Sequence, residues 1–449
     1  MFSLLAGVLS LAIAAQAAVI VPGAAWTDTD GNVIQAHGGG FLKVDSTWYW
    51  WGEDKSHNSG SFKAVSCYSS PDLMTWKRET DALTPVAGTN ISDSNIVERP
   101  KVIYNKKNNE YVMWFHADSS NYGAAQQGVA TASTPCGPFK FRESFQPLGA
   151  QSRDMGIFVD GEHGQVPYTA YVLYASDNNQ NFKISRLDDD YYTVTEQVNQ
   201  ISSSTLESPG IFKRDGTYYL IASHTTGWAP NPNKFFTASS IDGTFSSQAD
   251  IAPSNTRTYY SQNTFELPLG DDVLYAGDRW RPSLLGSSRY IWLPLTFDSG
   301  KPQLVWADVW SVDINAGTYT IAQGTTYEAE SATRAGNTTV ISNSAFSEGK
   351  GIGYIGKGGT VTFENVEGTG KPQWVSIYYA NGDSSYRTVS VSVNGGDSVS
   401  VDQPDSGGSS VILSVPVQLT LKSGSNTLTF GDQDSYAGDL DKIIVYTDA

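Results

Sequence analysis

The sequence predicts an all-β protein in which a five-bladed β-propeller is followed by a smaller β-sandwich (jelly-roll) module. Polar residues recur at a nearly constant interval in the first two-thirds of the chain, with steps of 56, 53 and 55 residues between Glu98, Asp154, Glu207 and Gln262. Each of them precedes a short apolar, aromatic-rich stretch of the kind that forms a strand. A period of roughly 50 residues filled with short strands is typical of propeller blades.

The five predicted blades begin near residues 39, 98, 152, 207 and 261 and contain similar hairpins. Asp or Asn stands at the hairpin tips, as in Asp215-Gly216, and an aromatic strand follows. Such residues supply the positive φ that a tight hairpin requires. No segment shows sustained helical periodicity. The polar residue that begins each repeat would therefore lie near a common axis, where a sugar could bind.

The composition changes near residue 315. After that point tryptophans nearly vanish, and Gly, Ser, Thr and Val become frequent. Alternating stretches at residues 388–393 and 426–430 predict half-buried strands of a sandwich. We therefore expect the propeller over residues 18–315, a linker over 316–325 and the sandwich over 326–449, which is long enough to fold alone.

The first 17 residues have the features of a secretory signal peptide. Residues 4–15 form an apolar run, and residues 15–17 (Ala-Gln-Ala) have the form of a cleavage site, although no Lys or Arg precedes the run. The run is too short to span a bilayer, and no later segment is long enough. We expect a secreted, extracellular protein that does not associate with membranes.

Cys67 and Cys136 suit an extracellular protein, and we expect them to form a disulfide between adjacent blades. Two separate buried thiols are the alternative. Asn90 and Asn337 begin the Asn-x-Ser/Thr triplets that accept glycans in secreted eukaryotic chains.

The chain is acidic, with 46 Asp and Glu against 29 Lys and Arg and a net charge of −17. This balance disfavours nucleic acid, anionic membrane surfaces and polyanionic substrates as partners. A neutral polysaccharide is compatible with it. We expect the protein to be a monomer.

The carboxyl groups of Glu98, Asp154 and Glu207 are candidates for glycoside cleavage. That reaction needs a protonated acid at the leaving oxygen and an opposing group that activates water or attacks the anomeric carbon. Clustered carboxylates raise the pKa of at least one member, which makes a usable acid. The alternative is that each caps an inner strand or pairs with Arg99 or Arg153. Three such residues at one period favour a shared site.

Aromatic residues in loops are candidates for stacking on the apolar face of a sugar. These are Trp228, Trp280 and Tyr122, although most of the 12 tryptophans are expected in the core between blades. Asp278 could hydrogen-bond sugar hydroxyls or pair with a neighbouring arginine. The five histidines show no metal-binding spacing.

Residues 20–315 resemble glycoside hydrolase family 43, whose five-bladed propellers hydrolyse arabinans, xylans and galactans with inversion. The matching features are the blade period, Ser-Ser-Pro-Asp-Leu-Met-Thr-Trp at 69–76, Gly-Pro-Phe at 137–139, Ser-Arg-Asp at 152–154 and Glu-Ser-Pro-Gly at 207–210. The resemblance implies that Glu207 is the general acid and that Asp154 orients it and tunes its pKa.

One departure from the family lies at the start of the first blade. An Asp usually acts there as general base, but residues 35–40 read Gln-Ala-His-Gly-Gly-Gly. This resembles the subgroup of exo-β-1,3-galactanases (galactan 1,3-β-galactosidases), which lack that base and have a Gln in the fifth blade, matched by Gln262. Gln262 would position the attacking water or, as an imidic tautomer, take its proton. Glu98 would bind hydroxyls of the terminal galactose, with water activation as its alternative role.

The C-terminal segment resembles carbohydrate-binding module family 35. The matching motifs are Tyr-Glu-Ala-Glu at 327–330, Gly-Ile-Gly-Tyr-Ile at 351–355 and Asp-Leu-Asp-Lys-Ile at 439–443. The resemblance implies a structural calcium ion held by Glu328, Glu330 and Asp441, with a surface acidic pair as the alternative. No cofactor is expected for catalysis. Sugar-binding candidates in this module are Tyr354, Asp383, Arg387, Tyr436 and Asp439.

The resemblances together imply a secreted, exo-acting, inverting glycoside hydrolase that releases galactose from the non-reducing end of β-1,3-galactan, the backbone of arabinogalactan. One alternative is an α-L-arabinofuranosidase or β-xylosidase of the same family, which the missing first-blade Asp disfavours. The other is a non-catalytic carbohydrate-binding propeller, which the retained Glu207 and Asp154 disfavour.

Overall fold

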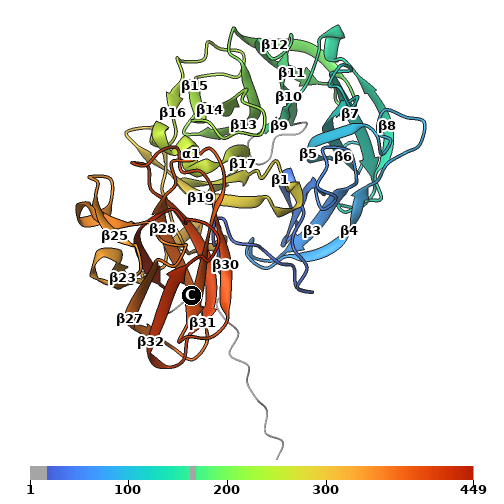
Figure 1. Ribbon diagram of the computed structural model, residues 1–449. Helices are drawn as coiled ribbons and strands as arrows, with labels where there is room; N and C mark the ends of the chain where they lie inside the picture. Colours follow the sequence, from blue (N-terminus) through green and yellow to red (C-terminus); the bar gives the residue numbers. More distant parts are fainter. Residues whose placement is uncertain (1–17, 162–167, 448–449) are drawn as a thin grey trace, which may run out of the picture.

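Five four-stranded antiparallel sheets are arranged around a common centre in the computed structural model, which describes residues 18–161 and 168–447 (Figure 1). The protein is therefore all-β, as predicted, and the ring of sheets agrees with the predicted five blades. The predicted signal peptide, residues 1–17, lies outside the described residues.

Each sheet is formed by four strands that follow one another in the chain. The strands of the five sheets are, in order, β1 (His37–Val44), β2 (Thr47–Glu53), β3 (Val65–Ser70) and β4 (Lys77–Leu83); β5 (Ile96–Asn105), β6 (Glu110–Asp118), β7 (Gln126–Ala132) and β8 (Lys140–Phe145); β9 (Met155–Asp160), β10 (Thr169–Ser176), β11 (Asn181–Leu187) and β12 (Val194–Ser202); β13 (Leu206–Arg214), β14 (Thr217–His224), β15 (Lys234–Ala238) and β16 (Ala249–Asp250); β17 (Gln262–Leu269), β18 (Asp272–Arg279), β19 (Arg289–Asp298) and β20 (Lys301–Leu304). The first strand of every sheet lies innermost, and these strands contact one another in ring order from β1 round to β17 and back to β1.

The aromatic-rich strands supply separate cores between adjacent sheets. Successive side chains of a strand point to opposite faces, so Trp50 packs with Trp292 between the first and fifth sheets. Its neighbour Trp51 packs with Phe115 between the first and second sheets. Similar cores fill the other three junctions. Burial of both faces explains why these strands are aromatic along their whole length.

Two sequence predictions about the hairpins and the cysteines are confirmed. The tip residues Asp45, Asn109 and Asp215 all have φ between 49° and 54°, in the left-handed region. Cys67 and Cys136 form a disulfide that joins the first and second sheets. Asn90 and Asn337 are both exposed, as a glycosylation site requires.

The segment before β1 connects the first and fifth sheets. Ile20 forms a β-bridge with Trp310, at the start of β21 (Trp310–Asp313). The Tyr290 hydroxyl on β19 donates to the carbonyl oxygen of Ile34 at 3.0 Å and accepts from the Ala36 amide at 2.8 Å. The ring is thus closed by contacts between residues far apart in sequence.

Two further antiparallel sheets follow the ring and share one core. The six-stranded sheet contains β23 (Thr325–Glu328), β25 (Thr339–Ser342), β26 (Lys350–Gly353), β28 (Pro372–Ala380), β31 (Leu413–Thr420) and β33 (Asp439–Val445). The five-stranded sheet contains β24 (Thr333–Ala335), β27 (Thr360–Gly368), β29 (Arg387–Val393), β30 (Ser398–Gln403) and β32 (Gly424–Gly431). Val389 and Val391 point into the shared core and Ile377 and Ile443 meet them from the other sheet.

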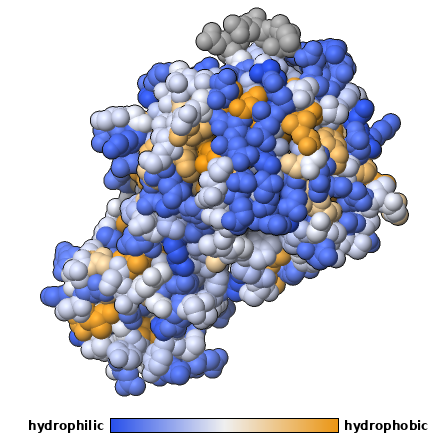
Figure 2. Space-filling model, turned by 90° about the horizontal axis from the view of Figure 1, so that it is seen from above, coloured by the Kyte–Doolittle hydropathy of each residue, from blue (hydrophilic) through white to orange (hydrophobic). Residues whose placement is uncertain are grey.

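The C-terminal sheets lie against the fifth sheet of the ring (Figure 1). Arg281 pairs with Asp402, and the Tyr446 hydroxyl donates to Asp308 at 3.0 Å. Residues 316–325, expected to be a linker, contain β22 (Thr318–Ile321), which pairs with β21. The face shown in Figure 2 is mainly hydrophilic over both parts of the molecule. Within the described residues, no helix is long and apolar enough to cross a bilayer.

Candidate active site

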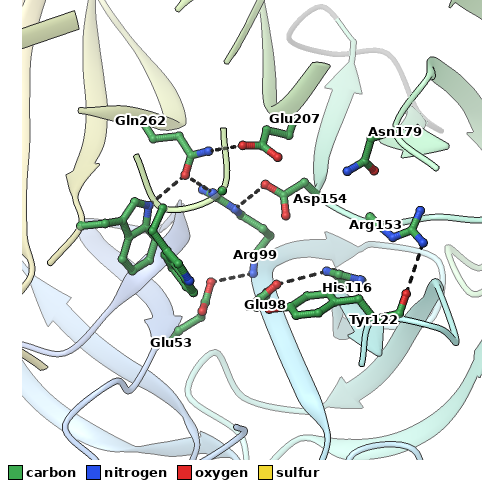
Figure 3. Close-up of a pocket in the computed structure, with 13 residues that line it drawn as sticks. Glu53, Glu98, Arg99, His116, Tyr122, Arg153, Asp154, Asn179, Glu207 and Gln262 are labelled. Carbon is green, nitrogen blue, oxygen red and sulfur yellow. Dashed lines mark hydrogen bonds and ion pairs between the residues drawn. The ribbon is translucent and has the colours of Figure 1, made fainter. Parts of the chain in front are cut away.

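A cavity of about 220 Å³ lies at the centre of the ring, at the end where the inner strands begin (Figure 3). Glu98, Asp154, Glu207 and Gln262, which the repeat predicts to converge, all line it. They come from four different sheets. Tyr122, Trp228 and Trp280, the predicted stacking residues, line it as well.

The inner strands of the second, fourth and fifth sheets share a register shift close to the residue that lines the cavity. The register with the second strand shifts directly after Glu98, Glu207 and Asn263. Arg99 and Ser208 accordingly have φ of 57° and 53°. A bulge at this place re-aims a side chain without ending the strand. The bulge recurs beside the cavity residues of three sheets, whereas β9 follows Asp154 in regular register with β10.

The Arg99 guanidinium is the centre of the polar network. Its Nε atom lies 3.1 Å from Oδ2 of Asp154, and its second terminal nitrogen donates to Oε1 of Gln262 at 2.6 Å. The other terminal nitrogen donates to the carbonyl oxygen of Asn263 at 3.1 Å, and the Arg99 amide donates to Glu53 at 2.9 Å. The guanidinium of Arg99 thus connects the second sheet with the third and fifth sheets, and its backbone amide connects it with the first. Asp154 thus pairs with Arg99, as the alternative interpretation has it, and also lines the cavity.

Glu207 carries a carboxyl group whose surroundings favour the protonated form. Burial and the negative charge of Asp154 raise its pKa to about 8, although the Arg99 charge lowers it. Asp154 in turn accepts hydrogen bonds from the Ser208 hydroxyl at 2.9 Å and from the Ser208 amide at 3.2 Å. A protonated carboxyl beside an ionisable one is the arrangement that can donate a proton to a leaving group.

The pKa of Glu98 is lowered, whereas that of Glu207 is raised. Burial alone would raise its pKa, but a hydrogen bond from His116, the charges of Lys55 and His116, and the Tyr122 hydroxyl lower it to about 2. The Tyr122 hydroxyl donates to Glu98 at 2.8 Å, and Nδ1 of His116 lies 3.3 Å from it. Glu98 is therefore an ionised acceptor on the cavity wall.

Among the described residues, Glu98, His116 and Asp154 could bring ligand atoms within 4.8 Å of one another for a metal ion. Burial lowers the pKa of His116, but its hydrogen bonds to Asp118 and Glu98 raise it to about 9. The acidic neighbours of His116 therefore favour its protonated form.

The orientation of the Gln262 carboxamide is set by two groups that can only donate hydrogen bonds. Its oxygen accepts from Arg99 and, at 2.8 Å, from the Trp280 indole nitrogen. Its NH2 group donates to Oε1 of Glu207 at 2.9 Å and to the Ser223 hydroxyl at 3.1 Å. Gln262 thus presents N–H donors to Glu207.

The structure does not bring Asp278 to the cavity wall, contrary to its predicted role as a sugar ligand. One oxygen lies 2.8 Å from Nδ1 of His37, and the other accepts from the Gly38 amide at 2.8 Å and from Thr264 at 2.7 Å. None of these three partners is an arginine, so the predicted pairing with a neighbouring arginine does not occur either. Asp278 holds the start of β1 against the fifth sheet.

Glu53 is a cavity residue that the sequence analysis missed. It ends β2 rather than beginning an inner strand, so it falls outside the repeat. A Cβ atom at Gly38 would lie only 2.2 Å from the Glu53 carboxylate, so glycine at this position, with φ of 61°, leaves the space that Glu53 occupies. The glycine run at residues 38–40 was the available signal.

The predicted calcium ligands partly meet in the C-terminal part. The Ser347 hydroxyl lies 2.6 Å from Glu328 and 2.8 Å from Asp441, so one hydroxyl serves two carboxylates. Burial and, to a smaller extent, the Glu328 charge raise the pKa of Asp441. One Glu330 carboxylate oxygen is buried without a hydrogen-bond partner among the described residues. Carboxylate oxygens are the ligands that a hard cation prefers, but within the described residues Glu328, Glu330 and Asp441 do not all bring a ligand atom within 4.8 Å of one another.

The predicted sugar-binding residues of the C-terminal part are mostly neighbours. Asp383, Arg387 and Tyr436 line one open depression of about 350 Å³. Tyr354 is 57% exposed and packs edge-on against Tyr436, with ring centroids 6.0 Å apart. Asp439 is half-buried and does not line the depression.

Comparison with solved structures gives strong matches over nearly the whole chain. An exo-β-1,3-galactanase from Phanerochaete chrysosporium, solved with β-1,3-galactotriose and with galactose, is 66% identical, with a TM-score of 0.93 over 95% of this chain and 100% of that chain. An exo-β-1,3-galactanase from Clostridium thermocellum is 26% identical, with a TM-score of 0.64, over 95% of this chain and 100% of that chain.

A putative exo-β-1,3-galactanase from Bifidobacterium bifidum is 35% identical, with a TM-score of 0.59, over 66% of this chain and 97% of that chain. No match was found among curated proteins. The profile of glycosyl hydrolases family 43 matches residues 40–265, the segment that contains all four polar residues of the repeat. The chain therefore belongs to glycosyl hydrolases family 43 and is a glycoside hydrolase.

Proposed function

We propose that the protein is an exo-acting, inverting hydrolase that releases galactose from the non-reducing end of β-1,3-galactan, the backbone of arabinogalactan. The observation that carries the proposal is the Glu207 carboxyl in a central cavity, beside Asp154 and with a raised pKa, in a chain that is 66% identical to an exo-β-1,3-galactanase. The cavity of about 220 Å³ is smaller than the roughly 300–1,000 Å³ of pockets for drug-sized ligands. This size favours one terminal sugar over an internal stretch of polymer.

In this proposal Glu207 protonates the glycosidic oxygen, and Asp154 maintains the raised pKa of that acid. The ionised Glu98 accepts hydrogen bonds from hydroxyls of the terminal galactose, and activation of water is its alternative role. Trp228, Trp280 and Tyr122 supply apolar surface beside the ring. Glu53 adds a second carboxylate acceptor on the same wall. No cofactor takes part.

Gln262 positions the attacking water in this proposal. Its imidic tautomer would carry a proton on the oxygen, but Arg99 and Trp280 both point donors at that oxygen and disfavour it. The N–H groups can hold the oxygen of a water molecule. Inverting enzymes separate acid and base by about 6.5–9.5 Å, so the 2.9 Å Gln262–Glu207 hydrogen bond must open when substrate enters.

We also propose that the two C-terminal sheets form a β-sandwich carbohydrate-binding module, of jelly-roll type, that holds the enzyme on its polymer. Support comes from the shared core of the two sheets and the open depression beside Asp383, Arg387 and Tyr436. Glu328, Glu330 and Asp441 would hold a structural calcium ion. The disulfide supports secretion into an oxidising, extracellular environment. We expect a monomer.

Hydrolysis of β-1,3-galactan should release galactose alone, first as the α-anomer. Proton NMR during the first minutes of the reaction gives the product, the mode of action and the stereochemistry together. Release of oligosaccharides would contradict exo action. Activity only on aryl arabinofuranosides or xylosides would indicate the other activities of the family, and no turnover on any of them would indicate a non-catalytic binding protein.

The kcat/KM of β-1,3-galactotriose hydrolysis should be constant at neutral pH and fall as pH rises through about 8. The reason is that Glu207, with its raised pKa, must be protonated to act as the acid.

Glu207→Gln should lower kcat by about 10²–10⁴-fold on galactotriose. The loss should be much smaller for an aryl galactoside, because its leaving group needs no proton. Glu266→Gln is the matched control, because burial raises the pKa of Glu266 to about 8 as well, but in another cavity. If Glu266→Gln removes the fall at high pH, Glu207 is not its source.

Gln262→Glu should lower kcat on galactotriose by about 100-fold, because the change removes both N–H donors and places a second carboxylate against Glu207. Steady-state kinetics on wild type and variant measure this effect. Unchanged turnover would make Gln262 a bystander and Glu98 the better candidate for water activation. Glu98→Gln provides that comparison.

Removal of calcium with EGTA should lower the melting temperature of the C-terminal part, and added Ca²⁺ should restore it, because three buried or half-buried carboxylates would otherwise repel one another. Differential scanning calorimetry measures both steps. Glu330→Gln should weaken the response, whereas Glu348→Gln, at an exposed carboxylate nearby, should not. A melting curve that is insensitive to Ca²⁺ in wild type would contradict the proposed site.

A further inference from the structure

The segment directly before Gln262 has an unusual backbone conformation. Residues 257–260 (Arg-Thr-Tyr-Tyr, α1 Arg257–Tyr260) have φ of 50°, 58°, 54° and 56° in succession. In this left-handed region the Cβ atom of an L-residue approaches its own backbone, so non-glycine residues visit it singly and rarely in runs. None of the four is glycine. Contacts outside the segment must therefore stabilise this left-handed turn.

The propeller supplies part of that support. Arg279 donates to the carbonyl oxygen of Tyr259 at 2.9 Å and to that of Tyr260 at 3.3 Å. The buried Thr258 hydroxyl accepts from the Asn233 amide at 2.7 Å. These bonds hold the middle and the end of the left-handed turn, but not its first residue.

The C-terminal part holds the first residue of the turn. One terminal nitrogen of Arg257 lies 3.0 Å from Oδ2 of Asp405, and the other donates to the Asp405 carbonyl oxygen at 2.7 Å. Both side chains are about one-fifth exposed, so solvent screens the pair only in part. Gly407 lets the loop approach, because a Cβ atom there would lie 3.1 Å from the Asn255 carbonyl oxygen.

The loop that carries Asp405 is itself well fixed. The hydroxyl of Ser406 accepts from the Asn381 amide at 2.9 Å and donates to the Asn381 carbonyl oxygen at 2.9 Å. Asn381 is fully buried and donates to the carbonyl oxygen of Gln403 at 3.0 Å. Asp405 can therefore act as a rigid support rather than as a mobile surface charge.

A short chain of bonds connects the turn to Gln262. Asn233, which is bonded to Thr258, accepts from the Asn263 amide at 2.7 Å through its side-chain oxygen. Its side-chain nitrogen lies 3.4 Å from the Ser261 carbonyl oxygen. Both neighbours of Gln262 in the chain are thus tied to the residue that supports the turn, so a change in the turn shifts the backbone that carries the carboxamide.

We propose that Asp405 is a positioning residue for catalysis: by binding Arg257 it stabilises the left-handed turn that orients Gln262 in the propeller. The C-terminal part then contributes to turnover itself and not only to attachment to polymer. This inference rests on the proposed function, because Gln262 must matter to the reaction for its orientation to affect the rate.

The chain offers a matched control in Asp402, which forms the other arginine–aspartate pair between the two parts, with Arg281. Arg281 forms no hydrogen bond to residues 257–260 among the described contacts. Asp405→Ala and Asp402→Ala both remove an ion pair from the same junction, but only Asp405 contacts the turn. Asp405→Ala also removes the hydrogen bond that the Gly407 amide donates to the Asp405 carboxylate at 2.7 Å. Asp405→Asn keeps a side-chain oxygen acceptor and removes the charge.

The test measures kcat and KM on β-1,3-galactotriose, which is soluble, so attachment to polymer does not contribute. Asp405→Ala should lower kcat about 10-fold with KM within about twofold, since misplacing a reacting group by about 1 Å can cost about 100-fold in rate. Asp405→Asn should lie between this variant and wild type, and Asp402→Ala should match wild type. Melting temperatures measured in parallel should fall in both alanine variants.

Hydrogen exchange of residues 254–264 provides a second readout that needs no activity, and it should be faster in Asp405→Ala but not in Asp402→Ala. Equal kcat in Asp405→Ala and wild type, or equal losses in both alanine variants, would overturn the inference. Unchanged exchange in Asp405→Ala would overturn it as well. Failure of wild type to release galactose would instead overturn the proposed function, and exchange would still decide whether Asp405 supports the turn.

Discussion

The buried Arg99 guanidinium is the interaction on which the rest of the site depends. Moving a charge from water into a protein costs several kcal/mol unless other groups compensate it. Here Asp154 supplies the counter-charge, 3.1 Å from the guanidinium. The Gln262 side-chain oxygen and the Asn263 carbonyl oxygen accept hydrogen bonds from the two terminal nitrogens of Arg99. Because these groups belong to different sheets, the charge is satisfied only when the ring is closed. The polar centre and the apolar junctions between sheets therefore require each other.

The same ring shifts the pKa values of two glutamates in opposite directions. Glu98 and Glu207 occupy equivalent positions near the start of the inner strands of the second and fourth sheets, and Glu98 is buried while Glu207 is half-buried. His116 and Lys55 stabilise the ionised form of Glu98, whereas Asp154 opposes ionisation of Glu207 more than Arg99 favours it. The difference comes from neighbours contributed by other strands, so one structural repeat can supply both an acceptor and a proton donor.

The sequence analysis predicted the cavity residues that the repeat places alike, and it missed the residues whose position depends on contacts between different strands and sheets. Glu98, Asp154, Glu207 and Gln262 could be predicted to converge because one period places them alike. Glu53 could not, because it comes from a second strand and reaches the cavity only through the space left at Gly38. Asp278 pairs with His37, 241 residues away, and no local pattern predicts such a partner. The left-handed run at residues 257–260 has no glycine to indicate it.

Several residues directly beside the cavity residues have a left-handed backbone conformation. Arg99 and Ser208 follow cavity residues with positive φ, and four more such residues precede Gln262. Residues in such conformations persist only where the surrounding structure over-determines them. The contacts that do so here are long-range: Glu53 holds the Arg99 amide, Asp154 holds Ser208, and the C-terminal part holds Arg257. Precision at this site thus comes from tertiary contacts rather than local preference, and a part of the chain outside the propeller can influence it.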